Sequence, residues 1–213
     1  MDTDEAGWTA VTTTEQLEAL LGRPGRRALA KERDRLDEIH RAWLEASPFC
    51  VLSTSDATGR CDSSPKGDPA GRLVHVVDDR TIALAERSGN RRVDGYRNVL
   101  ENPHVGLLFV VPGRGDTLRV NGRARLVSEA PFLDALAVQG RRPALAMVVE
   151  IETVFFHCAK AFSRAHLWEP DTWAPDRVPS RAVIAHELEP IPGLGLAELE
   201  ERYRPENYDR GLY

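Results

Sequence analysis

The sequence contains little cysteine and no pattern that would build a disulfide framework or a zinc site. Its 3 cysteines are Cys50, Cys61 and Cys158, and no two of them have CxxC spacing. An odd number of widely spaced cysteines argues against both kinds of site. We therefore expect reduced thiols, as in a cytoplasmic protein, and no metal centre.

Long apolar runs and a basic charge are also missing. No stretch approaches the roughly 20 apolar residues that a membrane-spanning helix needs. Residues 1–10 are acidic and polar, unlike a secretory signal. The net charge is −5, whereas nucleic-acid-binding scaffolds usually carry a basic excess. We expect a cytoplasmic protein with no membrane or nucleic-acid partner.

The glycine-rich fingerprints of the common nucleotide-binding folds do not occur either. Neither GxGxxG nor GxxxxGK[ST] is found in the sequence. What is present is an ordinary globular composition, with 42% hydrophobic and 29% charged residues. A chain of 213 residues is long enough to bury a hydrophobic core without the help of disulfides or metal ions.

Hydrophobic periodicity predicts helices early in the chain and short strands after them. Helices are expected over residues 14–21 and 28–45, where apolar residues recur at helical spacing. A third helix, over residues 92–101, should end at the step from Asn102 to Pro103. The other expected elements are strands at 49–54, 61–65, 73–77, 81–85, 105–111, 117–127 and 144–156, and a short helix at 130–139.

Seven strands with mostly short connections indicate an antiparallel barrel, because parallel strands need longer crossovers. The predicted fold class is therefore mainly β with flanking helices. We expect residues 1–46 to form N-terminal helices that pack on the barrel, and residues 47–168 to form the barrel domain. Residues 169–213 carry scattered prolines and little periodicity, which predicts an irregular tail.

Two short segments carry the chemistry that the sequence suggests. The string SGNRR at residues 88–92 lies between a predicted strand and a predicted helix. Small residues and two arginines at a helix start can hold a phosphate, because backbone N–H groups and guanidinium groups both donate to its oxygens. The same letters also fit a plain turn with two solvated arginines. The second segment, SSPKGD at residues 63–68, lies at the end of the second predicted strand.

These segments belong to an ordered series: SPKGD at 64–68, GNRR at 89–92, NVLENPHVGLLF at 98–109, PGRGDTLRVNGRARL at 112–126 and FFHCAKAF at 155–162. The series resembles the FMN-binding split barrels of the pyridoxamine 5'-phosphate oxidase-like family, and is nearest to a bacterial subgroup of FMN-dependent enzymes. The resemblance covers residues 47–168. It implies an antiparallel split β-barrel, bound FMN, and a homodimer with the cofactor site at the subunit interface.

The resemblance also implies, by position, which residues contact the cofactor. The family's amide contact on the long strand falls on Thr117, so it is altered or taken over by Arg119. Trp168 matches a late tryptophan that touches the flavin, and interface packing is the alternative for it. The full implied set is Ser64, Pro65, Lys66, Gly67 and Asp68 along the flavin, Asn90, Arg91 and Arg92 at the phosphate, then Thr117, Arg119, Lys160, Arg164 and Trp168.

Oxidation of vitamin B6 itself is not expected, because the matching substrate-phosphate stretch keeps only Arg142 of three family residues. We expect an FMN-dependent oxidoreductase for an unidentified small molecule, either an oxidase or a reductase fed by NAD(P)H. A cation at Lys66 or Arg119 would raise the flavin potential. The alternatives are a non-catalytic flavin-binding or redox-sensing protein, and a member of the same fold that binds F420 or haem.

His157 is the one candidate for a catalytic proton donor. It is followed directly by Cys158 in a predicted strand. Neighbouring strand residues point to opposite faces, which makes a nucleophile–base pair of the two geometrically poor. The alternative is that one of them points inward and is inert.

Overall fold

The computed structural model describes residues 6–213, and the chain divides after residue 32 into two compact units. The first unit contains α1 (Thr14–Leu21) and α2 (Arg26–Leu29). Thr13 caps α1 by accepting a hydrogen bond from the backbone N–H of Gln16 at 3.2 Å. The prediction that these helices pack on the barrel stays a prediction.

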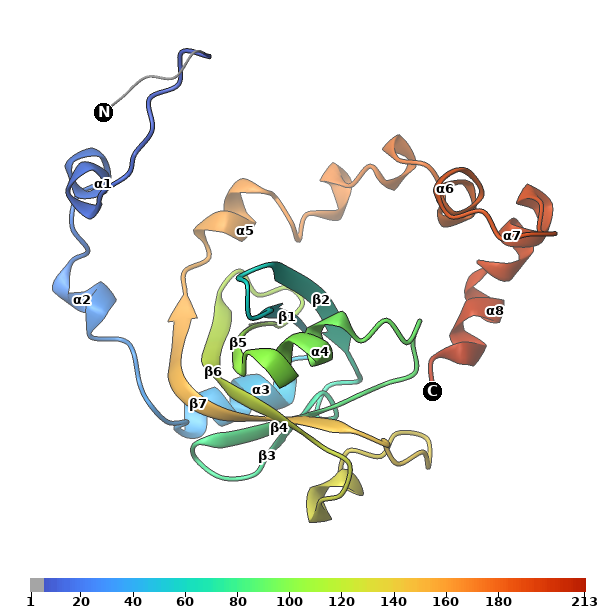
Figure 1. Ribbon diagram of the computed structural model, residues 1–213, viewed down its shortest axis with the longest axis horizontal. Coiled ribbons are helices and arrows are strands. Elements are labelled where there is room, and N and C mark those ends of the chain that lie inside the picture. The colour runs from blue at the N-terminus through green and yellow to red at the C-terminus, as the bar shows by residue number, and fades with distance from the viewer. Residues whose placement is uncertain (1–5) are drawn as a thin grey trace. The chain divides into compact units, whose positions relative to one another are not determined.

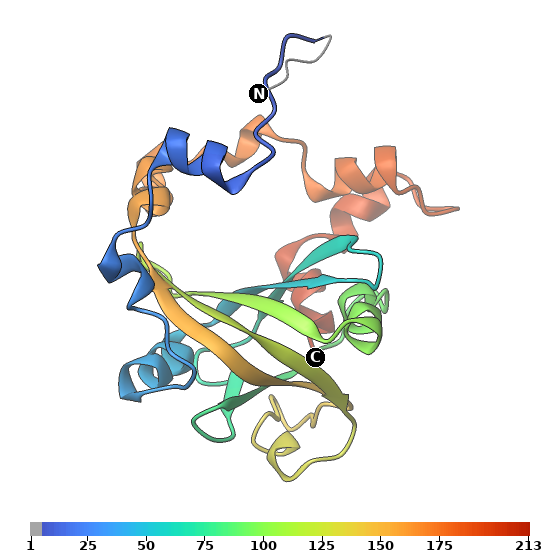
Figure 2. The same cartoon turned by 60° about the vertical axis from the view of Figure 1, so that its left-hand side comes forward.

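The second unit is built on one antiparallel sheet in the order β2-β1-β5-β6-β7-β4-β3 (Figure 1). The strands are β1 (Phe49–Ser55), β2 (Cys61–Gly67), β3 (Val74–Val76), β4 (Thr81–Ala85), β5 (His104–Val110), β6 (Thr117–Val127) and β7 (Ala146–His157). The sheet curls strongly, as the turned view shows (Figure 2). Among the described residues no pairing joins the edge strands β2 and β3, so the sheet is not closed. The predicted mainly β fold with flanking helices is confirmed.

The helices of this unit are α3 (Glu38–Ala46), α4 (Asp94–Glu101), α5 (Lys160–Arg164), α6 (Arg181–Leu188), α7 (Leu196–Arg202) and α8 (Pro205–Tyr208). No helix within residues 6–213 is long and apolar enough to span a membrane.

The predicted continuous helix over residues 28–45 is wrong. The chain leaves the helical path between α2 and α3, where Arg33 exchanges backbone hydrogen bonds with Val154 of β7. Asp37 then starts α3 by accepting hydrogen bonds from the N–H groups of Ile39 and His40. Pairing with the sheet therefore outweighs the helical periodicity of this stretch.

The predicted helix over residues 130–139 is also wrong, since only a 3-10 turn forms at Pro131–Leu133. Leu133 and Leu136 are buried in a small cluster against β4 and β7. Gln139 adopts a left-handed conformation at φ 51°, which a helix cannot continue. The apolar residues of this stretch therefore pack a loop against the sheet, although their spacing resembles that of a helix.

The tail predicted to be irregular is largely helical. Pro170, Pro175 and Pro205 each lie in the first turn of a short helical segment, where the missing N–H is not needed. Ala182 and Leu199 are buried together between α6 and α7. The prolines therefore begin helical segments in this tail.

The main core lies on the inner face of the sheet. Alternate residues of the central strands are buried there, such as Leu107 and Phe109 of β5. Trp43 of α3 and Val99 of α4 belong to the same cluster. Between Asn121 and Gly122 the pairing of β6 with β7 shifts by a bulge.

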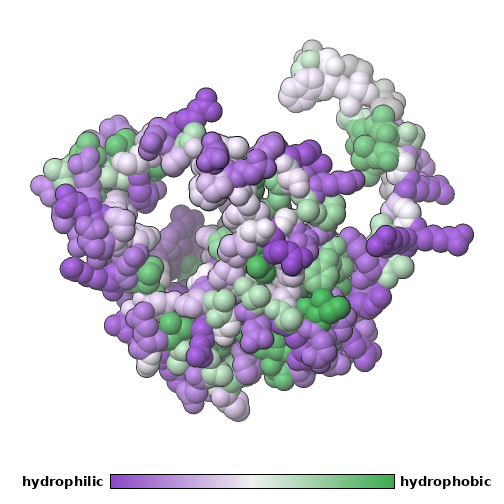
Figure 3. Space-filling model, turned by 180° about the vertical axis from the view of Figure 1, so that it is seen from behind, coloured by the Kyte–Doolittle hydropathy of each residue, from purple (hydrophilic) through white to green (hydrophobic). Residues whose placement is uncertain are grey.

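Hydrophilic side chains cover most of the surface seen from behind, with hydrophobic ones in small separate patches (Figure 3).

Candidate functional site

The SPKGD segment lies on the edge strand β2. Paired residues on neighbouring strands share a face, and Lys66 pairs with Cys50 while Ser64 pairs with Leu52. Cys50 and Leu52 are fully buried in the core. Ser64 and Lys66 therefore face inward, and Pro65 between them faces outward.

Lys66 connects this edge strand to the segment that carries GNRR. Its ammonium nitrogen lies 3.2 Å from Oε2 of Glu86, which follows β4, and 3.2 Å from the hydroxyl of Tyr96 in α4. Burial, and then the hydrogen bond to Glu86, raises the pKa of Tyr96, so its phenol stays neutral. Burial likewise raises the pKa of Cys50 to about 12, which leaves its thiol unreactive.

A second link lies beside the first one, formed by Asp68, two residues after Lys66, and Arg87, the residue after Glu86. The carboxylate of Asp68 accepts a hydrogen bond from Nε of Arg87 at 2.8 Å. The Asp68 side chain is only 2% exposed and that of Arg87 is 16% exposed. Arg87 also donates to the carbonyl of Leu136 at 2.8 Å, and Tyr213 donates to Asp68 at 2.9 Å. The ion pair is thus buried and well satisfied.

The GNRR loop is exposed at the start of α4. The Asn90 side chain accepts a hydrogen bond from the N–H of Arg92 at 3.0 Å, and Arg92 pairs with Asp94 at 2.7 Å. Arg91 is left-handed, with φ 60°, and forms no ion pair with any described residue. No side chain caps α4 at Val93. The N–H of Tyr96 donates to the carbonyl of Val93 at 2.9 Å, so the N–H groups of Asp94 and Gly95 are the ones that an anion could use.

Thr117 and Arg119 lie elsewhere, on the outer face of β6. Arg119 pairs with Leu108 and Phe155, and its guanidinium lies 4.8 Å from the Phe155 ring centre. In the strand order, β6 is three positions from β2, which is about 14 Å at normal strand spacing. The strand register aligns Lys66 with Leu118, the neighbour of Arg119. Within one chain Lys66 and Arg119 therefore lie on opposite faces of the sheet, and they cannot both contact the same side of one flavin ring.

The last predicted residues lie beyond β7. Lys160 and Arg164 are exposed in α5. The indole N–H of Trp168 donates to the carbonyl of Arg114, in the turn between β5 and β6, at 2.7 Å. His157 ends β7 directly opposite Thr117. These residues are separate from the Lys66 cluster within one chain.

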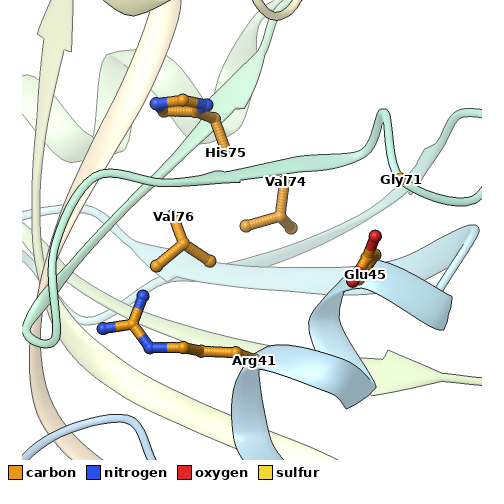
Figure 4. Close-up of a pocket in the computed structure, with 6 residues that line it drawn as sticks. All are labelled: Arg41, Glu45, Gly71, Val74, His75 and Val76. Carbon is orange, nitrogen blue, oxygen red and sulfur yellow. The ribbon is translucent and has the colours of Figure 1, made fainter. Parts of the chain in front are cut away.

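Two cavities lie away from the predicted residues. One, of about 250 Å³, lies between α3 and β3, at the edge opposite β2. Figure 4 shows Val74 and Val76 on the same side of the strand as Arg41, with His75 on the other side. A second groove, of about 400 Å³, includes Trp43, whose indole N–H has no hydrogen-bond partner among the described residues. Neither cavity contains a predicted cofactor residue.

Four residues of this site were not predicted: Glu86, Arg87, Tyr96 and Tyr213. Glu86 and Arg87 come immediately before SGNRR, so their position next to this segment could have identified them as site residues. Tyr96 is a single aromatic residue in a helix, and Tyr213 is 145 residues from its partner Asp68. No local pattern connects residues so far apart.

Comparison with known proteins places the geometry in a family context. The family model described as pyridoxamine 5'-phosphate oxidase matches residues 36–158, more than half of the chain. No curated protein matches the sequence.

Solved structures with a similar fold include HupZ from Group A Streptococcus, at 22% identity and TM-score 0.46, covering 57% of this chain and 93% of that one. A candidate pyridoxamine 5'-phosphate oxidase from Lactobacillus delbrueckii has 22% identity and TM-score 0.46, covering 59% and 98%. An FMN-binding protein from Syntrophomonas wolfei has 15% identity and TM-score 0.42, covering 56% and 89%.

Proposed function

The chain belongs to the pyridoxamine 5'-phosphate oxidase family, and from that premise we propose that it is an FMN-dependent oxidoreductase acting on a small molecule. The observation that carries the proposal is the double link between the SPKGD segment and the residues on either side of GNRR. Lys66 contacts Glu86 and Tyr96, and Asp68 pairs with Arg87. Polar contacts between residues about 20 positions apart in the sequence thus hold the SPKGD segment beside the residues that flank GNRR.

The residues at this edge fit the chemistry of FMN. The exposed Arg91 and the uncapped start of α4 would hold the phosphate dianion. Arg92 already pairs with Asp94, so a phosphate would compete with that carboxylate for its guanidinium. Ser64 and Lys66 would contact the polar part of the ring system.

The outer face of the sheet supports a homodimer. One row across it reads Pro65, Val51, Leu108, Arg119 and Phe155, from β2 to β7. Val51 and Leu108 are half-buried, although they point away from the core. Adjacent apolar residues that stay partly exposed across several strands form a surface that a second protein can cover. A second copy would cover this row and bring its own Arg119, Lys160, Arg164 and Trp168 towards the neighbouring chain's cofactor segments.

When bound, FMN would supply the hydride or electron transfer. Lys66, held by Glu86 and Tyr96, would stabilise negative charge on the reduced ring. His157 remains the candidate proton donor, on the same outer face as Thr117. A His157→Gln variant with unchanged substrate turnover and unchanged flavin reoxidation would remove it from the mechanism.

Mass spectrometry of the cofactor released from the purified protein tests the proposal. FMN is the expected result, and F420 or haem would identify the alternative ligands. Turnover of NAD(P)H or of an oxidisable amine or alcohol by the FMN-loaded protein separates the enzyme from a flavin-binding or redox-sensing protein. Bound FMN without any turnover across such a panel would favour the binding protein.

A further inference from the structure

Tyr213 connects the tail to the SPKGD segment and to the residue that precedes SGNRR. Its hydroxyl donates to Oδ1 of Asp68 at 2.9 Å, and its ring lies 5.8 Å from the guanidinium carbon of Arg87. Asp68 ends the SPKGD segment, and Arg87 directly precedes SGNRR. The end of the described chain thus returns to the sheet at the junction of the two segments (Figure 1).

Tyr213 completes the hydrogen bonding of a buried carboxylate. Oδ2 of Asp68 is used by Arg87, and Oδ1 is used by the phenol. A buried carboxylate oxygen left without a donor is costly, so the phenol stabilises the ion pair in its observed position. Burial and the contact with Asp68 raise the pKa of Tyr213, as expected for a phenol that donates to a carboxylate.

The tail that carries Tyr213 has a small core of its own. Ala182 and Ala185 of α6 are buried against Leu199 of α7, with Tyr203 packed beside them. Ser180 caps α6 through a hydrogen bond from the N–H of Val183. This folded tail lies outside residues 36–158, which the family model matches. It is therefore a feature of this chain beyond the shared barrel.

We propose that Tyr213 is a positioning residue of the cofactor site, and that residues 181–213 form a strap which it fastens to the site's edge. The inference rests on the proposed function. With the phenol bound, Asp68 and Arg87 hold the two cofactor segments at a fixed separation. Without it, the ion pair opens to water, the segments move apart more easily, and FMN leaves faster.

The test compares Tyr213→Phe with Tyr208→Phe in the full-length protein. Both changes remove one hydroxyl from the same tail, and Tyr208 is an exposed side chain that packs beside Tyr203. Two quantities are measured: the rate of FMN release from the loaded protein, and backbone hydrogen exchange of residues 181–213 in the cofactor-free protein. We expect Tyr213→Phe to speed FMN release about tenfold or more, and to raise exchange in the tail. Tyr208→Phe should match the wild type.

Two outcomes would overturn the strap. One is unchanged tail exchange in Tyr213→Phe, which would show that the phenol does not fasten the tail. The other is faster tail exchange with an unchanged FMN release rate, which would show that the tail does not act on the site. A wild-type protein that takes up no FMN contradicts the proposed function instead, and the exchange measurement still reports on the contact with Asp68.

Discussion

The ammonium of Lys66 lies 3.2 Å from the carboxylate of Glu86, at the point where the edge strand meets the loop before α4. The cation expected to tune the flavin is therefore already paired. A paired lysine exerts a weaker field on a nearby ring than an isolated one, because the two charges partly cancel. Glu86 thus sets how strongly Lys66 acts.

This pairing predicts opposite effects of two substitutions on the FMN midpoint potential. Lys66→Met should lower it, because the anionic reduced flavin loses a cation, and Glu86→Gln should raise it. A change of about 1.4 kcal/mol corresponds to about 30 mV for a two-electron couple, and we expect shifts of that order.

Potentiometric titration of the loaded variants measures both shifts. Arg125→Met is the control, because it removes a cation far from Lys66. The residue of β6 in register with Lys66 is Leu118, and Arg125 lies seven residues further along that strand. Equal midpoint potentials in wild type and Lys66→Met would show that this lysine does not contact the ring.

The outer face of the sheet predicts the position of the interface in the proposed homodimer. Leu108→Glu places a charge in the middle of the apolar row, so we expect the dimer to dissociate to monomers and the FMN affinity to fall. Leu100→Glu makes the same change at a leucine of α4 that is 75% exposed, and should leave the dimer intact. Light scattering coupled to size-exclusion chromatography gives the masses. A Leu108→Glu protein that remains dimeric would place the interface elsewhere.

The buried imidazole of His40 predicts a loss of stability in acid. Burial lowers its pKa, with Arg33 acting in the same direction and Asp37 opposing. The unfolded chain therefore binds a proton more readily, so stability should be fullest above about pH 6.5 and decline as the pH falls towards 5. His40→Gln keeps a side-chain acceptor for the N–H of Asp37 and removes the titration.

Urea unfolding between pH 5 and pH 8 measures the free energy of unfolding for this comparison. We expect a shallower pH dependence in His40→Gln than in wild type. His186→Gln, at an exposed position, should follow the wild-type curve. Identical curves for wild type and His40→Gln would show that His40 does not account for the acid sensitivity.

The bulge in β7 opposite Asn121 and Gly122 predicts a severe effect of a very small substitution. A Cβ atom at Gly122 would overlap the backbone carbonyl oxygen of Glu150. Gly122→Ala should therefore destabilise the protein by about 3 kcal/mol. At Gly106, also in a strand, a Cβ would meet only ordinary contacts, so Gly106→Ala should change the unfolding free energy by much less. Equal unfolding free energies for the two variants would contradict the close packing at the bulge.

Much of the barrel could be predicted from the sequence, because strand periodicity and turn residues are local signals. All seven strands, including Thr81–Ala85 and Thr117–Val127, lie within two residues of their expected limits. The family resemblance is confirmed by the match over residues 36–158. The helix expected over residues 28–45 failed because Arg33 pairs with Val154, and that contact is not local.

The candidate site also has parts that local sequence signals predicted and parts that they did not. The SPKGD and GNRR segments were proposed from their residue types and from the family resemblance, and the structure links SPKGD to the residues on either side of GNRR. Local reasoning did not find Tyr213, whose hydrogen bond to Asp68 depends on the path of the whole tail. It also could not show that Lys66 and Arg119 lie on opposite faces, because that depends on the register of four strands. The cofactor roles of these residues stay predictions.

The most direct test of the account is calorimetric titration of cofactor-free protein with FMN and with riboflavin, in wild type and in an Arg91→Gln, Arg92→Gln double variant. Riboflavin lacks only the phosphate. If the two arginines hold that phosphate, the double variant should bind FMN at least about tenfold more weakly and riboflavin as the wild type does. Equal FMN affinity in both proteins, or an equal loss for both ligands, would contradict the phosphate seat at the start of α4.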